Sequence, residues 1–456
     1  MKYPFSHSIS WKDLIHRETG IALGLFAVAL IPRLLWALHD HPVPFSDMED
    51  YYLCAVNLLK GKYLAMSEDR LAYRAPLYPL FIAACLKSVP GYGLETLRIA
   101  QAVIGSLSVV LLFHLSRMIL APMKKDWESW GEWISLGLAS AAALAMALTS
   151  SQIFFTPLLM TETLFIFELL AWCLLAFRIT QHSGMAPLTG LSVLLGLLAL
   201  TRPAALMLLP ILVFMALRFI PRPAWRKGLW LPFFGWLVPI LPWTIRNLIQ
   251  LHAFVLITTN SGVNFYIGHN PDYEYYQTGK KEMIRQMLAR ESGVDEVAED
   301  RYFFRLGMNY ILDEPGALFR QSGMKLYYLY WVDVPPWPWE EYGDRQGPQY
   351  SPLPSLPMLQ WNPAWLLLSL AGVMYAFIKK YPHGIILSVI VLHTGTCLVY
   401  FARTRFRLPI EPFLLLYAWL GVVSLAETAK PFYRSLIKPA PSKEPPSSFE
   451  EISLRH

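Results

Sequence analysis

Three carboxylates lie within four residues of the sequence, at Asp47, Glu49 and Asp50, shortly after the first long apolar segment. Acidic side chains avoid hydrocarbon, so a cluster beside a membrane segment either faces water or takes part in a reaction. A positioned carboxylate can take the proton from an attacking hydroxyl group. We therefore predict that Asp47 is a general base. An ordinary solvated loop is the competing interpretation of the cluster.

Arginines and one further acid recur at the boundaries of later apolar segments. They are Arg74, Glu162, Arg202, Arg246, Arg403, Arg405 and Arg407. Guanidinium groups bind phosphate oxygens bidentately and stay charged at any relevant pH. The set suits a sugar transfer from a phosphate-bearing lipid, in which cations stabilise the phosphate as it leaves. Arg202 and Arg246 could instead end helices at lipid headgroups, and Glu162 could simply favour a helix N-terminus.

The composition is that of an integral membrane protein. Of 456 residues, 55% are hydrophobic and only 16% are charged, whereas soluble domains average about 25% charged residues. The net charge of +6 is accounted for by basic cytoplasmic loops, so no nucleic-acid partner is indicated. The cysteines show no metal-ligand spacing, and a disulfide between Cys54 and Cys85 stays open.

The hydropathy pattern predicts an all-α polytopic protein with about 10 transmembrane helices (range roughly 9–12). The expected spans are about 20–38, 96–120, 133–150, 162–177, 187–200, 203–219, 229–245, 364–378, 385–401 and 408–426. Arg33 is close enough to the outer end of the first span to snorkel. Short basic loops all fall on one side, which places both termini in the cytoplasm and the acids and arginines at the outer face.

Three regions are expected along the chain. Residues 1–19 form a cytoplasmic N-terminus, residues 20–430 a membrane domain, and residues 431–456 a cytoplasmic tail of disordered composition. Within the membrane domain, two large outer loops cover about 39–95 and 248–360. The first holds a helix over 47–61 and a juxtamembrane helix over 77–86. The second holds a β-like run at 254–259, a helix over 294–312 and a Pro- and Trp-rich irregular stretch at 335–357.

A series of short motifs runs from Asp47 to Pro412 in a fixed order. They are Asp47-x-x-x-Tyr51, Tyr73-Arg74-Ala75-Pro76-Leu77, Met160-Thr161-Glu162-Thr163, Leu200-Thr201-Arg202-Pro203, Pro242-Trp243-Thr244-Ile245-Arg246-Asn247, Asn260-Ser261-Gly262-x-Asn264, Gly268-x-Asn270-Pro271 and Arg405-Phe406-Arg407-Leu408-Pro409. In this order the chain resembles the polyprenyl-phosphate-sugar-dependent C-type glycosyltransferases. It is similar in particular to the family 39 and aminoarabinose-transferase-like branch of the dolichyl-phosphate-mannose protein mannosyltransferase superfamily.

The resemblance implies a C-type glycosyltransferase fold and a role for several residues. Asp47 would be the catalytic base, Arg74 would contact the donor phosphate, and Glu162 would be a second acid. Relatives often carry two adjacent acids, whereas Met48 follows Asp47 here, which leaves open whether Glu49 or Asp50 takes that second place.

The expected function is transfer of a sugar, hexosyl or pentosyl, from a polyprenyl-phosphate donor to a lipid, glycan or protein acceptor. The reaction would proceed with inversion at the periplasmic or external face of the inner (plasma) membrane. Glu49, Asp50, Arg202 and Arg405 are predicted to bind substrate beside Arg74. No cofactor is required by the residues, and a divalent metal stays open. A polytopic transporter or lipid flippase is the alternative, and a non-enzymatic scaffold protein is a third.

Overall fold

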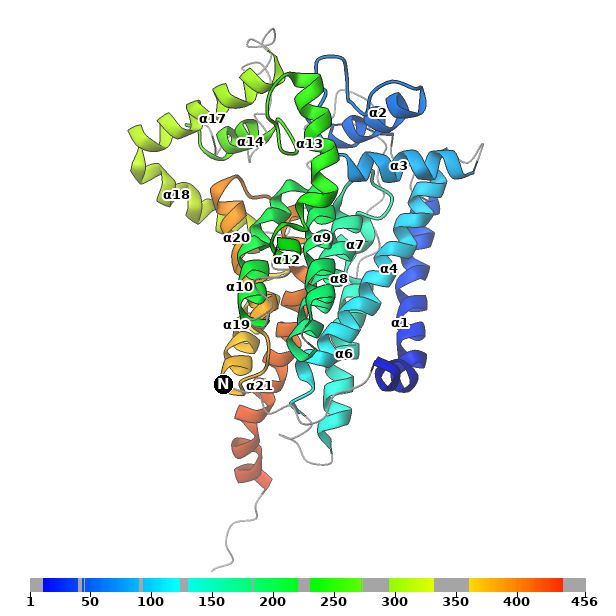
Figure 1. The fold of residues 1–456 in the computed structure, drawn as a ribbon. Helices are drawn as coiled ribbons and strands as arrows, with labels where there is room; N and C mark the ends of the chain where they lie inside the picture. The colour runs from blue at the N-terminus through cyan, green and yellow to red at the C-terminus, as the bar shows by residue number, and fades with distance from the viewer. Residues whose placement is uncertain are drawn as a thin grey trace, which may run out of the picture.

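The computed structural model describes residues 11–39, 43–44, 46–89, 93–123, 130–182, 184–219, 230–271, 273, 295–331 and 361–437. Over these residues the protein is a bundle of helices with a cap of shorter helices at one end, the upper end in Figure 1. The described residues contain no strand, and their one isolated bridge joins Ser67 to Arg70. The predicted irregular stretch at 335–357 and residues 1–10 and 438–456 of the termini lie outside the described residues.

Among the described residues, five helices are long and apolar enough to cross a membrane: Glu18–His39 within α1 (Trp11–His39), α4 (Gly93–Leu120), α6 (Gly131–Leu148), α8 (Glu162–Gln181) and Glu411–Ala429 within α21 (Glu411–Ile437). Four shorter apolar segments coincide with other predicted spans: α9 (Met185–Thr201), η2 with α10 (Pro203–Phe219), α19 (Pro363–Ile378) and α20 (Gly384–Val399). Nine of the predicted spans are therefore continuous helical segments. α21 also runs past the expected domain boundary at residue 430.

The seventh predicted span, about 229–245, is wrong as a single helix. It is divided into α12 (Trp230–Phe234) and α13 (Leu237–Leu251), which meet at Gly235 and Trp236. The Ser192 hydroxyl accepts a hydrogen bond from the Trp236 amide at 2.9 Å. A Cβ atom at Gly196 would overlap the Trp236 carbonyl. The turn is thus set by close packing on α9, which hydropathy does not register.

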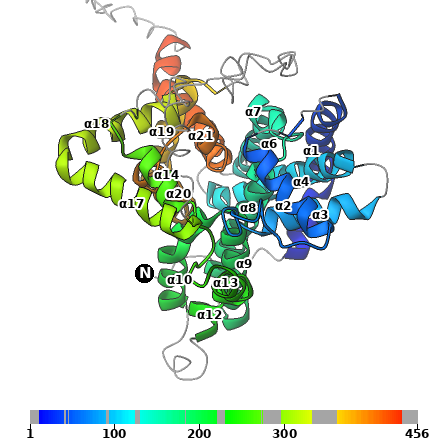
Figure 2. The same cartoon turned by 90° about the horizontal axis from the view of Figure 1, so that it is seen from above.

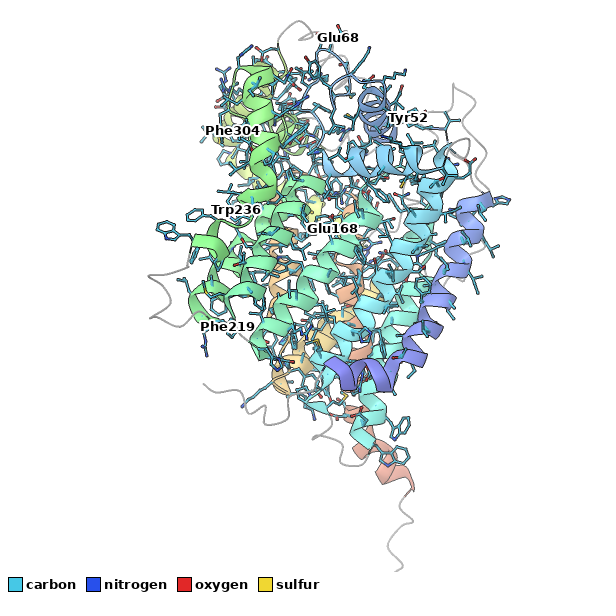
Figure 3. The ribbon with its side chains drawn as sticks, turned by 45° about the vertical axis from the view of Figure 1, so that its right-hand side comes forward. Tyr52, Glu68, Glu168, Phe219, Trp236 and Phe304 are labelled. Carbon is cyan, nitrogen blue, oxygen red and sulfur yellow. The ribbon has the colours of Figure 1, made fainter. Side chains whose placement is uncertain are left out.

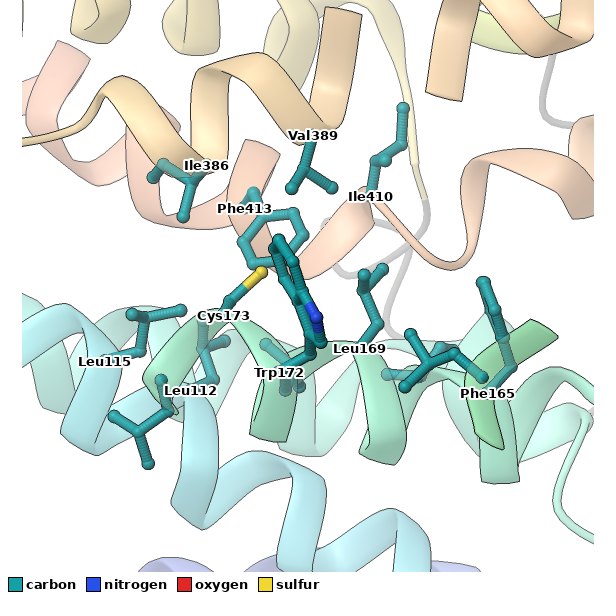
Figure 4. Packing of buried hydrophobic residues seen from close by; sticks show 14 of the residues in the cluster. Leu112, Leu115, Phe165, Leu169, Trp172, Cys173, Ile386, Val389, Ile410 and Phe413 are labelled. Atoms are coloured by element: carbon teal, nitrogen blue, oxygen red, sulfur yellow. The ribbon is translucent and has the colours of Figure 1, made fainter. Parts of the chain in front are cut away.

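α8 lies at the centre of the bundle and packs on α4 and α9. Figure 4 shows its side chains Phe165, Leu169, Trp172 and Cys173 facing residues of α4, α20 and the start of α21. Trp172 is fully buried and its indole N–H donates to the Leu191 carbonyl at 3.1 Å. Bringing a polar indole into the core is tolerated because that hydrogen bond satisfies it. The first residue of this rigid helix is Glu162.

Arg33 does not snorkel, contrary to the prediction. It is 1% exposed and donates to the carbonyl oxygens of Ala29, Met146 and Ala147 at 3.0, 3.1 and 2.7 Å. The last carbonyls of a helix have no partner within that helix, so a buried guanidinium at the end of α6 satisfies them. The cysteines Cys54 and Cys85 are both free and buried, so the disulfide left open is not formed.

The cap joins the two segments that the sequence placed in separate outer loops. α2 (Asp47–Leu59) and α3 (Leu77–Ser88) come from the first; α14 (Ser261–Gly268), α17 (Glu296–Asp313), α18 (Pro315–Leu326) and η4 (Tyr327–Trp331) come from the second. Figure 1 shows α3 lying across the direction of α1 and α4, as expected of a juxtamembrane helix. From above, α2 and α3 lie on one side and α14, α17 and α18 on the other (Figure 2).

The β-like run at 254–259 is wrong as a strand prediction. Side chains of α13 occupy the backbone groups that a neighbouring strand would need. The Asn247 amide donates to the carbonyls of Val255 and Ile257, both at 3.2 Å. Thr244 donates to the Leu256 carbonyl at 2.8 Å. Alternating side chains make a strand only where a second strand is available to pair with it.

Candidate functional site

A cavity of about 1250 Å³ lies under the cap. Its walls come from α2, the segment before α3, the α9–η2 junction, α14, α17, α20 and η7 (Thr404–Arg407). Asp47, Glu49, Asp50, Arg74, Arg202 and Arg405 all line it. Residues from both ends of the chain therefore share one chamber of a size that suits a substrate.

Asp47 is the first residue of α2, where the helix dipole favours a carboxylate. Ser46 before it occupies the N-cap position at φ 52°, and its side chain makes no capping bond, contrary to the usual role of serine there. A non-glycine residue with positive φ stores backbone strain, and such strain gathers at functional sites.

Each carboxylate oxygen of Asp47 is bound by a different arginine. Oδ1 accepts from Arg74 Nη2 at 2.6 Å, and Oδ2 accepts from Arg405 Nη2 at 2.7 Å. Arg74 also donates from Nε and Nη2 to Asp50 Oδ2 at 3.1 and 2.6 Å. The rings of Tyr51 and Tyr73 lie 5.1 and 5.2 Å from the Arg74 guanidinium carbon. The network is thus built from three separate parts of the chain.

Burial alone would raise the pKa of Asp47, but Arg74 and Arg405 more than offset it and hold that pKa well below its usual range. For Asp50, burial prevails over the bond to Arg74 and raises the pKa, with Asp47 and Glu49 adding to the effect. Two neighbouring carboxyls therefore have opposite tendencies. Such a separation is typical of functional carboxylate pairs.

Glu162 is fully buried and lies just behind the cavity wall formed by Thr161 and Phe165. Its Oε1 accepts from Arg202 Nη2 at 3.0 Å. Both Arg202 and Arg405 lie over the Phe406 ring, at 5.9 and 5.3 Å. The Glu162–Arg202 pair is thus placed beside the Asp47–Arg405 pair. Arg202 faces the cavity, which does not support the headgroup interpretation.

Glu49 lines the cavity as an exposed side chain of the first turn of α2. Glu168 accepts a hydrogen bond from the Thr201 hydroxyl at 3.1 Å. Figure 3 shows Glu168 inside the bundle, below Tyr52 and Glu68 at the capped end. Among the described residues, no group of three His, Cys, Asp or Glu side chains could hold a metal ion.

Arg246 binds the protein backbone, not lipid headgroups. It donates to the carbonyls of Leu71 and Leu64 at 2.8 and 3.3 Å. Glu296 holds the same loop from the other side, because its Oε1 accepts from the amides of Leu71 and Ala72 at 2.9 and 3.0 Å. Arg74 follows this clamped loop directly, so both residues position it.

Glu296, Asp300 and Arg301 were not singled out from the sequence. Asp300 and Arg301 line the cavity wall opposite α2, on α17. Asp295 caps this helix, since its carboxylate accepts from the amides of Val297 and Ala298 at 3.0 Å. The run of charged residues at the start of this helix, Glu296, Glu299, Asp300 and Arg301, was the one available signal. It does not distinguish a cavity wall from a solvated surface.

No protein-family model and no curated protein matches the sequence. Several solved structures are similar in fold, including the following two. The apo oligosaccharyltransferase of Archaeoglobus fulgidus matches with a TM-score of 0.50 at 14% identity, over 94% of this chain and 52% of its own. The archaeal oligosaccharyltransferase AglB from the same organism, solved with an inhibitory peptide and a dolichol-phosphate, matches with a TM-score of 0.50 at 13% identity, over 96% and 53%.

The protein has the C-type glycosyltransferase fold. This confirms the fold class expected from the sequence. The chain spans about half the length of each of the two structures it matches (52% and 53%). At these identities the likeness is one of fold, and function has to be argued from the cavity.

Proposed function

We propose that the protein is a membrane glycosyltransferase that moves a sugar from a polyprenyl-phosphate donor to an acceptor hydroxyl or amide. The observation that carries the proposal is the position of Asp47. It lies at the wall of a large cavity, between two arginines suited to phosphate, within a C-type fold. This combination supports a base and a phosphate site side by side.

The proposed reaction follows from these groups. The acceptor oxygen or nitrogen attacks the anomeric carbon and passes its proton to Asp47. The bond between that carbon and the phosphate oxygen breaks, and the lipid phosphate leaves with one more negative charge. Arg74 and Arg405 stabilise this charge because both are present where it develops. Attack and departure occur on opposite faces of the sugar, so the configuration inverts.

The remaining cavity residues are given supporting roles. Glu162 would be the second acid of the site, and its carboxylate would orient Arg202 toward the donor. Glu49 and Asp50 would contact substrate from α2. The wall of α14 and α17 would receive the acceptor, whether lipid, glycan or protein. We place the protein in the inner (plasma) membrane with the cavity facing the periplasm or outside, on the positive-inside rule.

The test uses purified protein in lipid nanodiscs with a polyprenyl-phosphate sugar and membrane extract as acceptor source. We expect release of free polyprenyl phosphate with wild type and a loss of at least about 100-fold with Asp47→Asn, the scale of general-base catalysis. Near-normal turnover of Asp47→Asn would remove it from the mechanism. In a parallel assay in sealed proteoliposomes, movement of intact donor across the bilayer without cleavage would favour the flippase alternative.

A further inference from the structure

The two arginine contacts that support Asp47 as a base also prevent its carboxylate from accepting a proton. Its Oδ1 is 2.6 Å from Arg74 and its Oδ2 is 2.7 Å from Arg405. The side chains of the three residues are only 23%, 14% and 11% exposed. Both oxygens that could receive a proton are therefore engaged by cations, with little water to compete. A carboxylate held in this way is a poor proton acceptor.

Other charged groups around Asp47 do not remove this hold. Asp50 and Glu49 on α2 and Glu162 on α8 are the neighbouring carboxyl groups, and Arg202 lies beside Glu162. Tyr51 and Tyr73 flank Arg74. Arg74 and Arg405 outweigh burial and leave the pKa of Asp47 well below its usual range. A new anion that binds the guanidinium groups would reverse the balance.

We propose that Arg74 and Arg405 mask Asp47 until the donor phosphate draws their guanidinium groups away, so that donor binding itself makes the base competent. This inference rests on the proposed function, since it takes a phosphodiester to be the ligand. Arg74 has Asp50 as a second carboxylate partner at 2.6 Å, so it would keep one anionic partner while it shares its N–H groups with phosphate. Arg405 exchanges Asp47 for a phosphate oxygen.

The masking enforces an order. An acceptor that enters the empty cavity meets a base with both oxygens occupied, and no proton transfer occurs. Once the phosphodiester is bound, Asp47 loses cationic partners while burial still disfavours its charge, so its proton affinity rises. Donor binding and proton affinity at Asp47 are thereby linked, and by reciprocity the linkage can be measured from either side.

The first test measures proton uptake on ligand binding and needs no catalysis. Wild-type protein is titrated with octyl methyl phosphate near pH 5 by calorimetry in two buffers of different ionisation enthalpy. The probe is a phosphodiester, which does not itself titrate at this pH. We expect net proton uptake with wild type, and much less with Asp47→Asn. Binding without uptake, or equal uptake in Asp47→Asn, would overturn the masking.

Two further variants keep the test decisive if Asp47→Asn fails to fold. Arg405→Gln already lacks half of the mask, so uptake per bound ligand should fall by about half. Arg305→Gln removes a cation that is exposed on α17, outside the cavity lining, and serves as the charge-matched control. It should match wild type. Uptake in Arg405→Gln equal to the control would count against the proposal.

The second test uses turnover. In wild type, the acid limb of kcat, which reports the donor complex, should lie at least about one pH unit above that of kcat/KM, which reports the free enzyme. Coincident limbs would refute the masking. Proton uptake without any sugar transfer would support the masking of Asp47 and refute the proposed glycosyltransferase function. Asp47-dependent sugar transfer without proton uptake would support the function and refute the masking.

Discussion

Removal of the Arg74 guanidinium should lower the free energy of unfolding, because Arg74 binds both Asp47 and Asp50. Arg74→Gln deletes three charge-assisted hydrogen bonds, one to Asp47 and two to Asp50, at 2.6, 2.6 and 3.1 Å. It leaves two carboxylates whose side chains are 23% and 22% exposed close together without their shared cation. Removing one partner of a buried ion pair costs about 3–5 kcal/mol. Because these side chains keep some exposure, we expect about 3 kcal/mol.

The stability assay is thermal unfolding in a fixed detergent at pH 7. A loss of about 3 kcal/mol should lower the apparent Tm by roughly 3–6 °C for a chain of this length. Arg305→Gln is the charge control and should leave Tm unchanged. The double variant Arg74→Gln with Asp50→Asn should recover part of the loss, because the pKa of Asp50 is raised by burial and a neutral amide is tolerated there.

The same variant should weaken donor binding. One charge-assisted contact contributes roughly 1.5–3 kcal/mol, which is about tenfold to 150-fold in Kd. Arg74→Lys keeps the charge but loses the planar fork, so it should fall between Gln and wild type. Unfolding of Arg74→Gln at the same temperature as the Arg305→Gln control would show that Arg74 does not stabilise the protein through Asp47 and Asp50. An unchanged donor affinity would separately reject the phosphate role.

Three more outcomes are expected. Glu296→Gln should raise KM for the donor more than it lowers kcat, because it loosens the loop that positions Arg74 without touching the reacting atoms; an equal fall in kcat would contradict this. Lys325 is fully buried and burial lowers its pKa to about 7, so the native state binds fewer protons than the unfolded chain above that pH. Stability should therefore rise from about pH 7 toward 10 in wild type and stay flat in Lys325→Met, as followed by thermal unfolding. Gly372→Ala should lower Tm through α19 and α21, because its Cβ would overlap the Tyr417 carbonyl, whereas Gly395→Ala, with open space around it, should not.

Much of the architecture follows from local composition. A helix satisfies its backbone hydrogen bonds within one segment, so apolar runs of sufficient length predict helices regardless of what packs on them. The predicted helix over 47–61 is α2, Asp47–Leu59, and the short apolar run at 77–86 is α3, Leu77–Ser88. The same locality placed Asp47 and Glu162 at the first turns of helices, where carboxylates are favourable.

What depended on partners far away in the sequence was not predictable in this way. The divided seventh span and the false strand at 254–259 both reflect side chains of other segments that take up backbone groups. Local composition also predicted that Arg33 snorkels toward the membrane surface, whereas its guanidinium binds carbonyl oxygens at the end of α6 inside the protein. In each case the local pattern was real, and a tertiary contact outweighed it.

The site shows the same division. The sequence by itself determined which residue types stand at the ends of the helices, and hence that acids and arginines gather near one end of the bundle. Only the tertiary structure decided that Arg405 binds Asp47 across 358 positions of sequence, and that Glu162 binds Arg202 instead. Pairing of charges depends on distances set by packing of whole helices. That packing places Asp47 between Arg74 and Arg405.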